Sequence, residues 1–438
     1  MNARPRTLVV RLDSAGDVLL AGPAVRAVAA GSSWTAVLCG PAGAPAARLL
    51  PGVDEVLVYE APWVGLEPPP LTPDGVGRLV DAVAAGRFDR ALVLVSYHQS
   101  PLPAALLLRL AGVPWIGADS EDYPGALLEL RHHRADGRHE AEAALDLAGA
   151  AGFALPPGDD GRLRVGPVPD TTHLTGGDPY VVLHPGAAVP ARAWSPDRAA
   201  RAAAALHRAG HRVVVTGGPA ERALTARVAG RHGLDLGGAT TGLGELAGVL
   251  AGARAVVTGN TGPAHLAAAV GTPVACLFAP VVPAGRWRPY GVRHVLLGDQ
   301  RAACAETRAR VCPVPGHPCL DGVGDAEVTG AVASLLRPAP RPGPGPVPPP
   351  GARAPGAPPG PGGPHGPNGS HGPDGSHGPD DLDGSHGPDG SHSPDGSHGP
   401  DGPGRAERPR DLVARRDRPA AATSAATSVA GARGGTTA

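Results

Sequence analysis

Short runs of apolar residues recur along the first 336 residues and alternate with longer stretches that mix apolar and polar positions. In the first half, TLVVRL (7–12), TAVLCG (35–40), DEVLVYE (54–60) and RALVLVS (90–96) predict strands, and GPAVRAVAAG (22–31) and PLPAALLLRLAGV (101–113) predict helices. Uniformly apolar runs of this length are typical of strands buried on both faces. Strands that alternate with helices predict a parallel sheet with helices on both sides.

The second half repeats this alternation. Its predicted strands are YVVLHPG (180–186), RVVVTGG (212–218), RAVVTG (254–259) and VACLF (274–278). Its predicted helices are SPDRAARAAAALHRAG (195–210), AERALTARVAG (220–230), LGELAGVLAG (243–252), GPAHLAAAVG (262–271) and GDAEVTGAVASLL (324–336). Ser195 before Pro196 is a favourable helix start, because the hydroxyl can cap a free amide and proline fits the first turn.

Residues 164–179 separate the two halves and crowd Pro, Gly and Thr together without periodicity, which is typical of a linker. We therefore predict an α/β protein with two Rossmann-like, doubly wound domains, 1–170 and 171–336, that face each other across a cleft. After residue 336 the chain is almost entirely Pro, Gly, Asp, Ser, His and Ala. This composition predicts a disordered tail at 337–438, in which six histidines between 365 and 398 leave weak metal binding open.

The charge balance and the apolar content set limits on partners and location. The formal net charge is −1, so we expect no nucleic-acid partner. The N-terminus lacks the apolar segment of a signal peptide, and no uncharged apolar run reaches the ~20 residues of a membrane span. Five cysteines, an odd number, favour a reducing compartment. We expect a soluble, cytoplasmic protein.

Polar loops follow several predicted strands at the sheet edge where ligands of such folds bind. The strand at 254–259 is followed by Asn260, Thr261 and Gly262 at the start of a helix, whose free amides fit an anion such as a phosphate. An ordinary strand-to-helix turn is the alternative. Arg192 adds a fixed cation in the loop after 180–186, and His265 lies on the first turn of the 262–271 helix.

Glu221 follows the glycine pair 217–218, where a carboxylate can accept hydrogen bonds from ribose hydroxyls. Neither a G-x-G-x-x-G dinucleotide fingerprint nor a G-x-x-x-x-G-K-[ST] loop is present. The loops therefore favour a sugar nucleotide over NAD or a hydrolysed triphosphate.

Three segments resemble the signature regions of glycosyltransferase family 9, the heptosyltransferase-like enzymes: RLDSAGDVLLAGPAVRAV (11–28), HPGA with ARAWSPDR (184–198), and GNTGPAHLAAAVGTPVACLFAP (259–280). The resemblance covers about residues 6–336. It implies a GT-B fold with the acceptor mainly on the first domain and the nucleotide sugar mainly on the second. It also implies transfer that inverts the anomeric carbon and uses neither a metal ion nor another cofactor.

The resemblance also implies roles for single residues. Asp17 is similar to the general base of the family's G-D-V motif, with a helix cap as the alternative role and Asp13 as the nearest rival carboxylate. Arg192 is similar to the cation that neutralises the diphosphate, with a solvated surface cation as the alternative. Glu221 resembles the carboxylate that contacts the nucleoside.

The loop 260–265 matches the family pattern D-[TS]-G-x-x-H, which implies phosphate and sugar contacts for Thr261, Gly262 and His265. Asn260 stands where the family has aspartate, so a charged contact to the donor is absent or replaced by amide hydrogen bonds.

We therefore predict a transferase that moves a heptose or hexose from an ADP- or UDP-linked donor to a glycoconjugate acceptor of the cell envelope, as in lipopolysaccharide biosynthesis. A peripheral contact with the inner membrane face is compatible with such an acceptor. Two alternatives stay open, a GT-B nucleotide-sugar epimerase and a catalytically silent sugar-nucleotide-binding protein, and Asp17 disfavours the second.

Cys304, Cys312, Cys319 and His317 lie close together in the sequence, but their spacing differs from that of common paired-knuckle zinc sites. Related enzymes often carry a similar segment, so we predict a structural loop beside the cleft.

Overall fold

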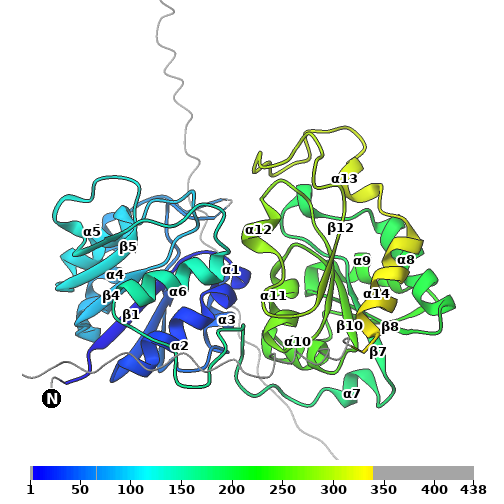
Figure 1. The fold of residues 1–438 in the computed structure, drawn as a ribbon, viewed down its shortest axis with the longest axis horizontal. Coiled ribbons are helices and arrows are strands. Elements are labelled where there is room, and N and C mark those ends of the chain that lie inside the picture. The colour runs from blue at the N-terminus through cyan, green and yellow to red at the C-terminus, as the bar shows by residue number, and fades with distance from the viewer. Residues whose placement is uncertain (1–2, 66, 339–438) are drawn as a thin grey trace, which may run out of the picture. The chain divides into compact units, whose positions relative to one another are not determined.

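The computed structural model describes residues 3–65 and 67–338, which form two six-stranded parallel sheets with helices packed on them (Figure 1). The predicted tail lies outside the described residues from residue 339 onward. The strands of the first sheet are β1 (Arg6–Arg11), β2 (Trp34–Cys39), β3 (Glu55–Val58), β4 (Arg90–Val93), β5 (Trp115–Asp119) and β6 (Leu130–His132). Those of the second are β7 (Tyr180–His184), β8 (Arg212–Gly217), β9 (Gly233–Gly237), β10 (Ala255–Gly259), β11 (Val274–Leu277) and β12 (His294–Leu297).

Both sheets have the same strand order. The first is β3-β2-β1-β4-β5-β6, and the second is β9-β8-β7-β10-β11-β12 when written in the same direction. This is the order of a doubly wound Rossmann sheet, in which the chain winds outward from the centre in both directions. The predicted fold class, two Rossmann-like domains in tandem, is therefore confirmed.

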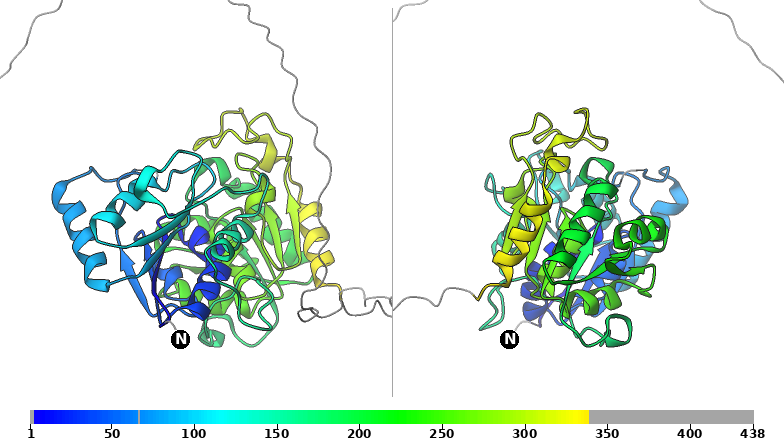
Figure 2. Two further views of the ribbon diagram at one scale, coloured as in Figure 1. Left: turned by 60° about the vertical axis from the view of Figure 1, so that its left-hand side comes forward. Right: turned by 90° about the vertical axis from the view of Figure 1, so that its right-hand side faces the viewer.

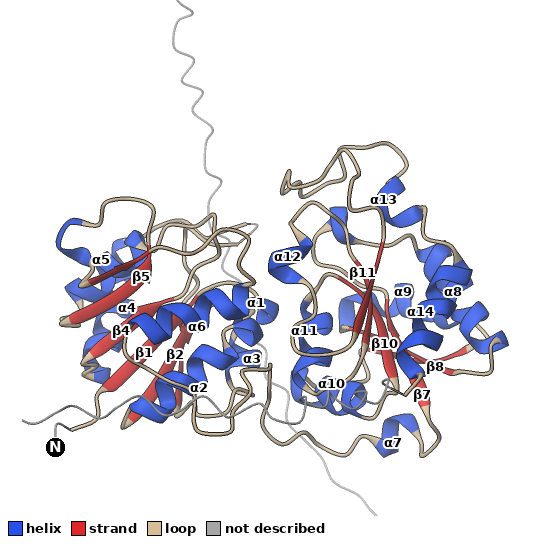
Figure 3. Cartoon of the chain, in the orientation of Figure 1, coloured by secondary structure: helices blue, strands red, loops and turns tan. Residues whose placement is uncertain are grey.

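Helices surround the strands in each half (Figure 3). The first half contains α1 (Ala15–Leu20), α2 (Gly22–Gly31), α3 (Ala44–Ala47), α4 (Pro73–Gly86), α5 (Leu102–Leu110) and α6 (Glu140–Ala150). The second contains α7 (Thr172–Thr175), α8 (Pro196–Arg208), α9 (Arg222–Ala229), α10 (Leu243–Ala251), α11 (Gly262–Ala269), α12 (Ala284–Trp287), α13 (Pro318–Asp321) and α14 (Asp325–Leu336). Ser195 lies at the N-cap of α8 as predicted, but its side chain makes no capping hydrogen bond.

Alternating residues of the strands supply separate cores. In β1, Val9 packs with α1, α2 and α6, whereas Leu8 and Val10 pack with α4 and α5 on the opposite face. In the second sheet, one face packs against α10 and α11, and the other against α8, α9 and α14. Helix α14 contacts α8 on that outer face (Figure 2).

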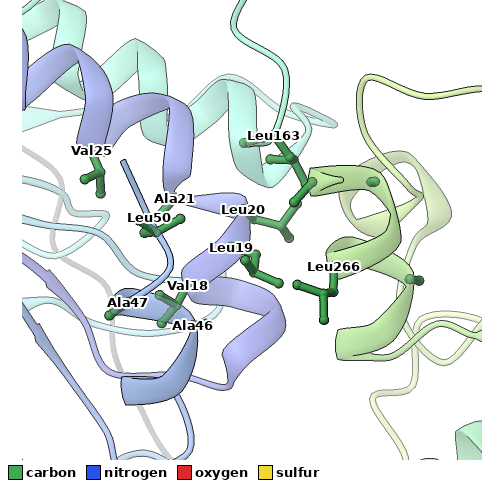
Figure 4. Close-up of a cluster of buried hydrophobic side chains, with 14 of the residues drawn as sticks. Val18, Leu19, Leu20, Ala21, Val25, Ala46, Ala47, Leu50, Leu163 and Leu266 are labelled. Atoms are coloured by element: carbon green, nitrogen blue, oxygen red, sulfur yellow. The ribbon is translucent and has the colours of Figure 1, made fainter. Parts of the chain in front are cut away.

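One of these cores continues from the first sheet to the second. Leu19 and Leu20 of α1 belong to the same buried cluster as Leu266 of α11, and Figure 4 shows Leu19 and Leu266 side by side. The described residues accordingly form one compact unit. The boundary near residue 170 stays a prediction, and the predicted linker contains the short helix α7. Within 3–65 and 67–338, no helix has the length and apolarity that a bilayer crossing requires.

Candidate active site

The strand order reverses between β1 and β4 in the first sheet and between β7 and β10 in the second. Loops that leave the strands at such a point diverge and leave a crevice at the carboxyl ends of the strands. A cavity of about 190 Å³ is lined by residues that follow all four of these strands. Six of the seven predicted site residues line it: Asp17, Arg192, Asn260, Thr261, Gly262 and His265.

The first turns of α1 and α11 approach each other at this cavity. A Cβ atom on Gly16 would lie 3.0 Å from Cδ2 of His265 and 3.3 Å from Cα of Gly262. Both distances are tighter than ordinary van der Waals contact, so the absence of a side chain at Gly16 permits the approach. A Cβ atom on Gly262 would meet only the amide nitrogen of Gly16, at 3.8 Å, so this helix start is free of bulk. Pro263 has no N–H and the Ala264 amide donates to the Thr261 carbonyl, so of the first three residues of α11 Gly262 is the one whose amide has no partner within the described residues.

Asp17 is held by three donors, two from the segment just before it and one from far along the chain. Ser14 Oγ donates to it at 2.7 Å, Arg11 Nη2 at 3.3 Å and Trp287 Nε1 at 3.4 Å. Burial opposes the charge on Asp17, but the nearby Arg11 cation and the Ser14 hydrogen bond outweigh it and lower the pKa of the carboxyl. Asp17 is therefore ionised at neutral pH.

Asp13, the rival carboxylate, also lines the cavity but has a different environment. Arg11 Nε lies 2.9 Å from Oδ2 of Asp13, and Gln99 Nε2 donates to Oδ1 at 2.6 Å. Burial raises the pKa of Asp13 to about 6 despite the attraction of Arg11. The two carboxyl groups therefore differ in their readiness to accept a proton.

Sequence reasoning named none of the three residues that hold Asp17, which are Arg11, Ser14 and Trp287. Arg11 is 2% exposed at the end of β1 and also bonds to Ser96 at 2.8 Å. A charged residue in an otherwise apolar, buried strand was a usable signal for Arg11. Trp287 comes from α12, 270 positions along the chain, and nothing local in the sequence pointed to it.

Several buried polar atoms in the cavity have no hydrogen-bond partner among the described residues. They are Nε of Arg192, Oγ1 of Thr261 and Nδ1 of His265. Burial lowers the pKa of His265 to about 4, so this ring is neutral at neutral pH. Because unpaired buried polar atoms cost free energy, the three atoms favour a polar ligand in the cavity.

Asn260 lines the cavity, but its side chain is used within the protein. Its Nδ2 donates to the carbonyl of Ala279, and its Oδ1 accepts from the amide of Ala279, both at 3.2 Å. The residue is 4% exposed. A direct hydrogen bond from Asn260 to a donor sugar would compete with one of these two bonds.

Glu221 does not line the cavity. Its Oε2 accepts from the amide of Gly218 at 2.8 Å, so the carboxylate caps its own helical turn. A Cβ atom on Gly186, in the loop after β7, would collide with this carboxylate. Glu221 therefore sits at the same sheet edge as Arg192, displaced toward β8.

The cysteine-rich loop supports the turn that carries Arg192. Nε2 of His317 bonds to the carbonyl of Ala191 at 3.1 Å. Cys304 and Cys319 are buried in the core between the second sheet and the helices α8, α9 and α14. In the part of the chain that the structure describes, no group of three or more His, Cys, Asp or Glu side chains is arranged to hold a metal ion.

The fold of this chain is similar to that of several solved structures. Among solved structures, a glycosyltransferase of family 9 from Veillonella parvula DSM 2008 has a TM-score of 0.64 at 18% identity, covering 77% of this chain and 98% of that one. The E. coli ADP-heptose LPS heptosyltransferase II has a TM-score of 0.58 at 20% identity, covering 76% and 98%. E. coli heptosyltransferase WaaC, solved with ADP-2-deoxy-2-fluoro heptose, has a TM-score of 0.56 at 21% identity, covering 75% and 99%.

At these identities the solved structures establish the fold. No curated protein matches the chain. The family model described as glycosyltransferase family 9 (heptosyltransferase) matches residues 76–317, more than half of the sequence. The chain therefore belongs to glycosyltransferase family 9 and is a glycosyltransferase.

Proposed function

We propose that the protein transfers a heptose or hexose from a nucleoside-diphosphate sugar to a hydroxyl of a glycoconjugate acceptor, with inversion and without a metal ion. One observation carries the proposal. The ionised Asp17 of the first half and the cation Arg192 of the second line one cavity, beside three buried polar atoms that have no partner among the described residues. An inverting transfer needs a base on one side of the anomeric carbon and a stabilised leaving group on the other.

Asp17 acts as the base. As the acceptor oxygen forms its bond to the anomeric carbon, the hydroxyl proton passes to the Asp17 carboxylate. The bond between that carbon and the diphosphate oxygen breaks on the opposite face, and its electron pair leaves with the nucleoside diphosphate. Attack opposite the leaving group inverts the configuration of the carbon.

Arg192 and the start of α11 stabilise the leaving diphosphate. The guanidinium supplies charge-assisted hydrogen bonds, and the Thr261 hydroxyl and the free Gly262 amide supply neutral ones. His265 is neutral at working pH, so its Nδ1 contributes a hydrogen bond and no charge. We assign the nucleoside contact to Glu221, which lies at the same sheet edge as Arg192.

The donor class takes support from the relatives. E. coli WaaC has been solved with ADP and with an ADP-linked fluoro-heptose, so an ADP-linked donor is tested first and a UDP-linked donor second. The acceptor proposed is a cell-envelope glycoconjugate, reached at the inner membrane face.

Titration calorimetry with ADP, UDP, GDP and CDP tests the donor side, and transfer from ADP-heptose and UDP-hexoses to envelope glycolipids tests the reaction. We expect one diphosphate to bind and the Asp17→Asn variant to bind it equally well without transferring sugar. If no diphosphate binds, the donor assignment is wrong. If Asp17→Asn transfers at the parent rate, the base is another group.

A further inference from the structure

A second cavity, of about 230 Å³, adjoins the one that contains Asp17. Ser96, in the loop after β4, lines both cavities. The Tyr97 ring lines the second and lies 5.7 Å from the ring of Trp287, which lines the first and donates a hydrogen bond to Asp17. The second cavity therefore lies beside the residues that hold Asp17.

Tyr97 and Arg286 form one end of this second cavity. The Arg286 guanidinium carbon lies 4.3 Å from the centre of the Tyr97 ring. Nη1 of Arg286 is buried and has no partner among the described residues, while Tyr97 is 36% exposed. A part-exposed aromatic ring next to an unpaired donor suits a sugar, whose C–H groups pack on the ring while its hydroxyls accept from the donor.

The other charges of the cavity disfavour an anionic ligand. Arg134 is the second cation, but its donors are used by Asp119, Glu140 and the carbonyl of Val95. Asp119 is in turn occupied by Arg134 and His132.

Two further carboxylates are free to interact with a ligand. Glu121 and Asp136 are exposed, and neither side chain has an ion pair or hydrogen bond within the described residues. The cavity thus offers two unpaired carboxylates against one guanidinium with a free donor. Glu121 and Asp136 would repel a phosphate or carboxylate on the ligand, whereas they would attract an amine.

We propose that this second cavity is the acceptor subsite, and that it takes a sugar ring that is uncharged or carries an amine in preference to a phosphorylated or carboxylated one. The inference rests on the proposed function, because it assigns the molecule whose hydroxyl Asp17 deprotonates. It narrows the acceptor to a glycoconjugate whose terminal sugar lacks an anionic group near the reacting hydroxyl.

The test uses the full chain and four probes that differ mainly in charge: methyl glucoside, methyl glucosaminide, methyl glucuronide and glucose 6-phosphate. Saturation-transfer NMR gives the dissociation constant of each. We expect the first two to bind and the last two to bind about twofold to fivefold more weakly, the size of effect that a contact between exposed, screened charges produces.

Three variants tie the binding to the cavity. Tyr97→Ala should weaken the binding of the neutral probe by about fivefold to tenfold. Tyr97→Phe keeps the ring and should largely retain this binding. The double variant Glu121→Gln with Asp136→Asn should remove the preference for the amine probe over the neutral one. Asp81→Asn, an exposed carboxylate on α4, is the matched control and should change neither.

Stronger binding of glucuronide or the phosphate would overturn the proposal, as would binding that Tyr97→Ala leaves unchanged in a variant with the parent melting temperature. All probes are measured with and without nucleotide. A parent protein that binds no nucleoside diphosphate would refute the donor side of the proposed function, while the sugar measurements still decide the acceptor subsite.

Discussion

Nη2 of Arg11 lies 3.3 Å from Oδ1 of Asp17, and the same buried guanidinium also contacts Asp13 and Glu140. Asp17 gains further donors from Ser14 and Trp287, and its pKa is lowered. For Asp13, burial outweighs the attraction of Arg11 and raises the pKa to about 6. Because the pKa values of the two carboxyl groups differ in this way, the pH dependence of activity can show which of them acts as the base.

The pH dependence of kcat/KM should report Asp17. Since a base must be ionised to accept a proton, activity should stay level from neutral pH down toward the ordinary aspartate pKa of 3.8 and decline only near or below it. If Asp13 were the base, activity would fall to half near pH 6. Steady-state rates across this range distinguish the two, and an acid limb centred near pH 6 would assign the role to Asp13.

Replacing the base should affect the chemical step and little else. Asp17→Asn keeps the size of the side chain and its ability to accept from Arg11 but cannot take a proton, so kcat should fall by about 10² to 10⁴-fold. Nucleotide affinity should stay within about twofold, because the side chain meets the acceptor hydroxyl. Asp13→Asn is the control and should give a much smaller loss. Equal losses in the two variants would argue that both carboxyl groups act as one unit.

Arg192 should account for a large part of the diphosphate affinity. Arg192→Ala should weaken nucleoside-diphosphate binding by about 1.5 to 3 kcal/mol, the range for a hydrogen bond to a charged group. Calorimetry measures this directly. Arg208→Ala, an exposed arginine at the end of α8, should bind as the parent does. An unchanged dissociation constant for Arg192→Ala would remove this residue from the site.

His317 should act on the nucleotide through the Arg192 turn. Its bond to the carbonyl of Ala191 fixes that turn, so His317→Ala should weaken diphosphate binding by about threefold to tenfold, the worth of one hydrogen bond. His317 has a φ of 47°, a left-handed conformation that asparagine tolerates better than alanine. His317→Asn therefore serves as the comparison that isolates the hydrogen bond from backbone strain. Parent affinity in both variants would show that the loop does not position Arg192.

The elements that the sequence predicted best are those with uniform apolar runs. The strand runs at 7–12 and 254–259 correspond to β1 and β10 within a residue or two at each end, and the helix at 22–31 matches α2. Helix α1 was missed because its six residues are too few to show a helical period. Strand β6 has three residues and is partly exposed, so it carries no apolar run.

The site divides in a similar way. Motif resemblance named residues in the segments that follow β1, β7, β8 and β10, and parallel strands bring these segments to one edge of each sheet. It could not supply Trp287 or the second cavity, since these depend on how α12 and the loop after β4 meet in space. The bonds of Asn260 could not be predicted either, because Ala279 contributes only its backbone carbonyl and amide, which any residue would offer.

Restoring the family's aspartate with Asn260→Asp should therefore lower the stability of the protein, whatever it does to donor specificity. In Asn260→Asp, one carboxylate oxygen can still accept from the Ala279 amide, but the other faces the Ala279 carbonyl without a proton to donate. Leaving that buried carbonyl unpaired should lower the free energy of unfolding by about 1 to 3 kcal/mol at neutral pH. A protonated carboxyl can donate the missing bond, so the loss should shrink as the pH falls. Asn260→Ala, which removes both bonds, should show a loss that does not depend on pH in this way. Urea unfolding at pH 7 and pH 5 measures the two variants side by side. If Asn260→Asp is as stable as the parent at pH 7, the loop after β11 can move to re-pair Ala279, and the asparagine is then free to contact a donor.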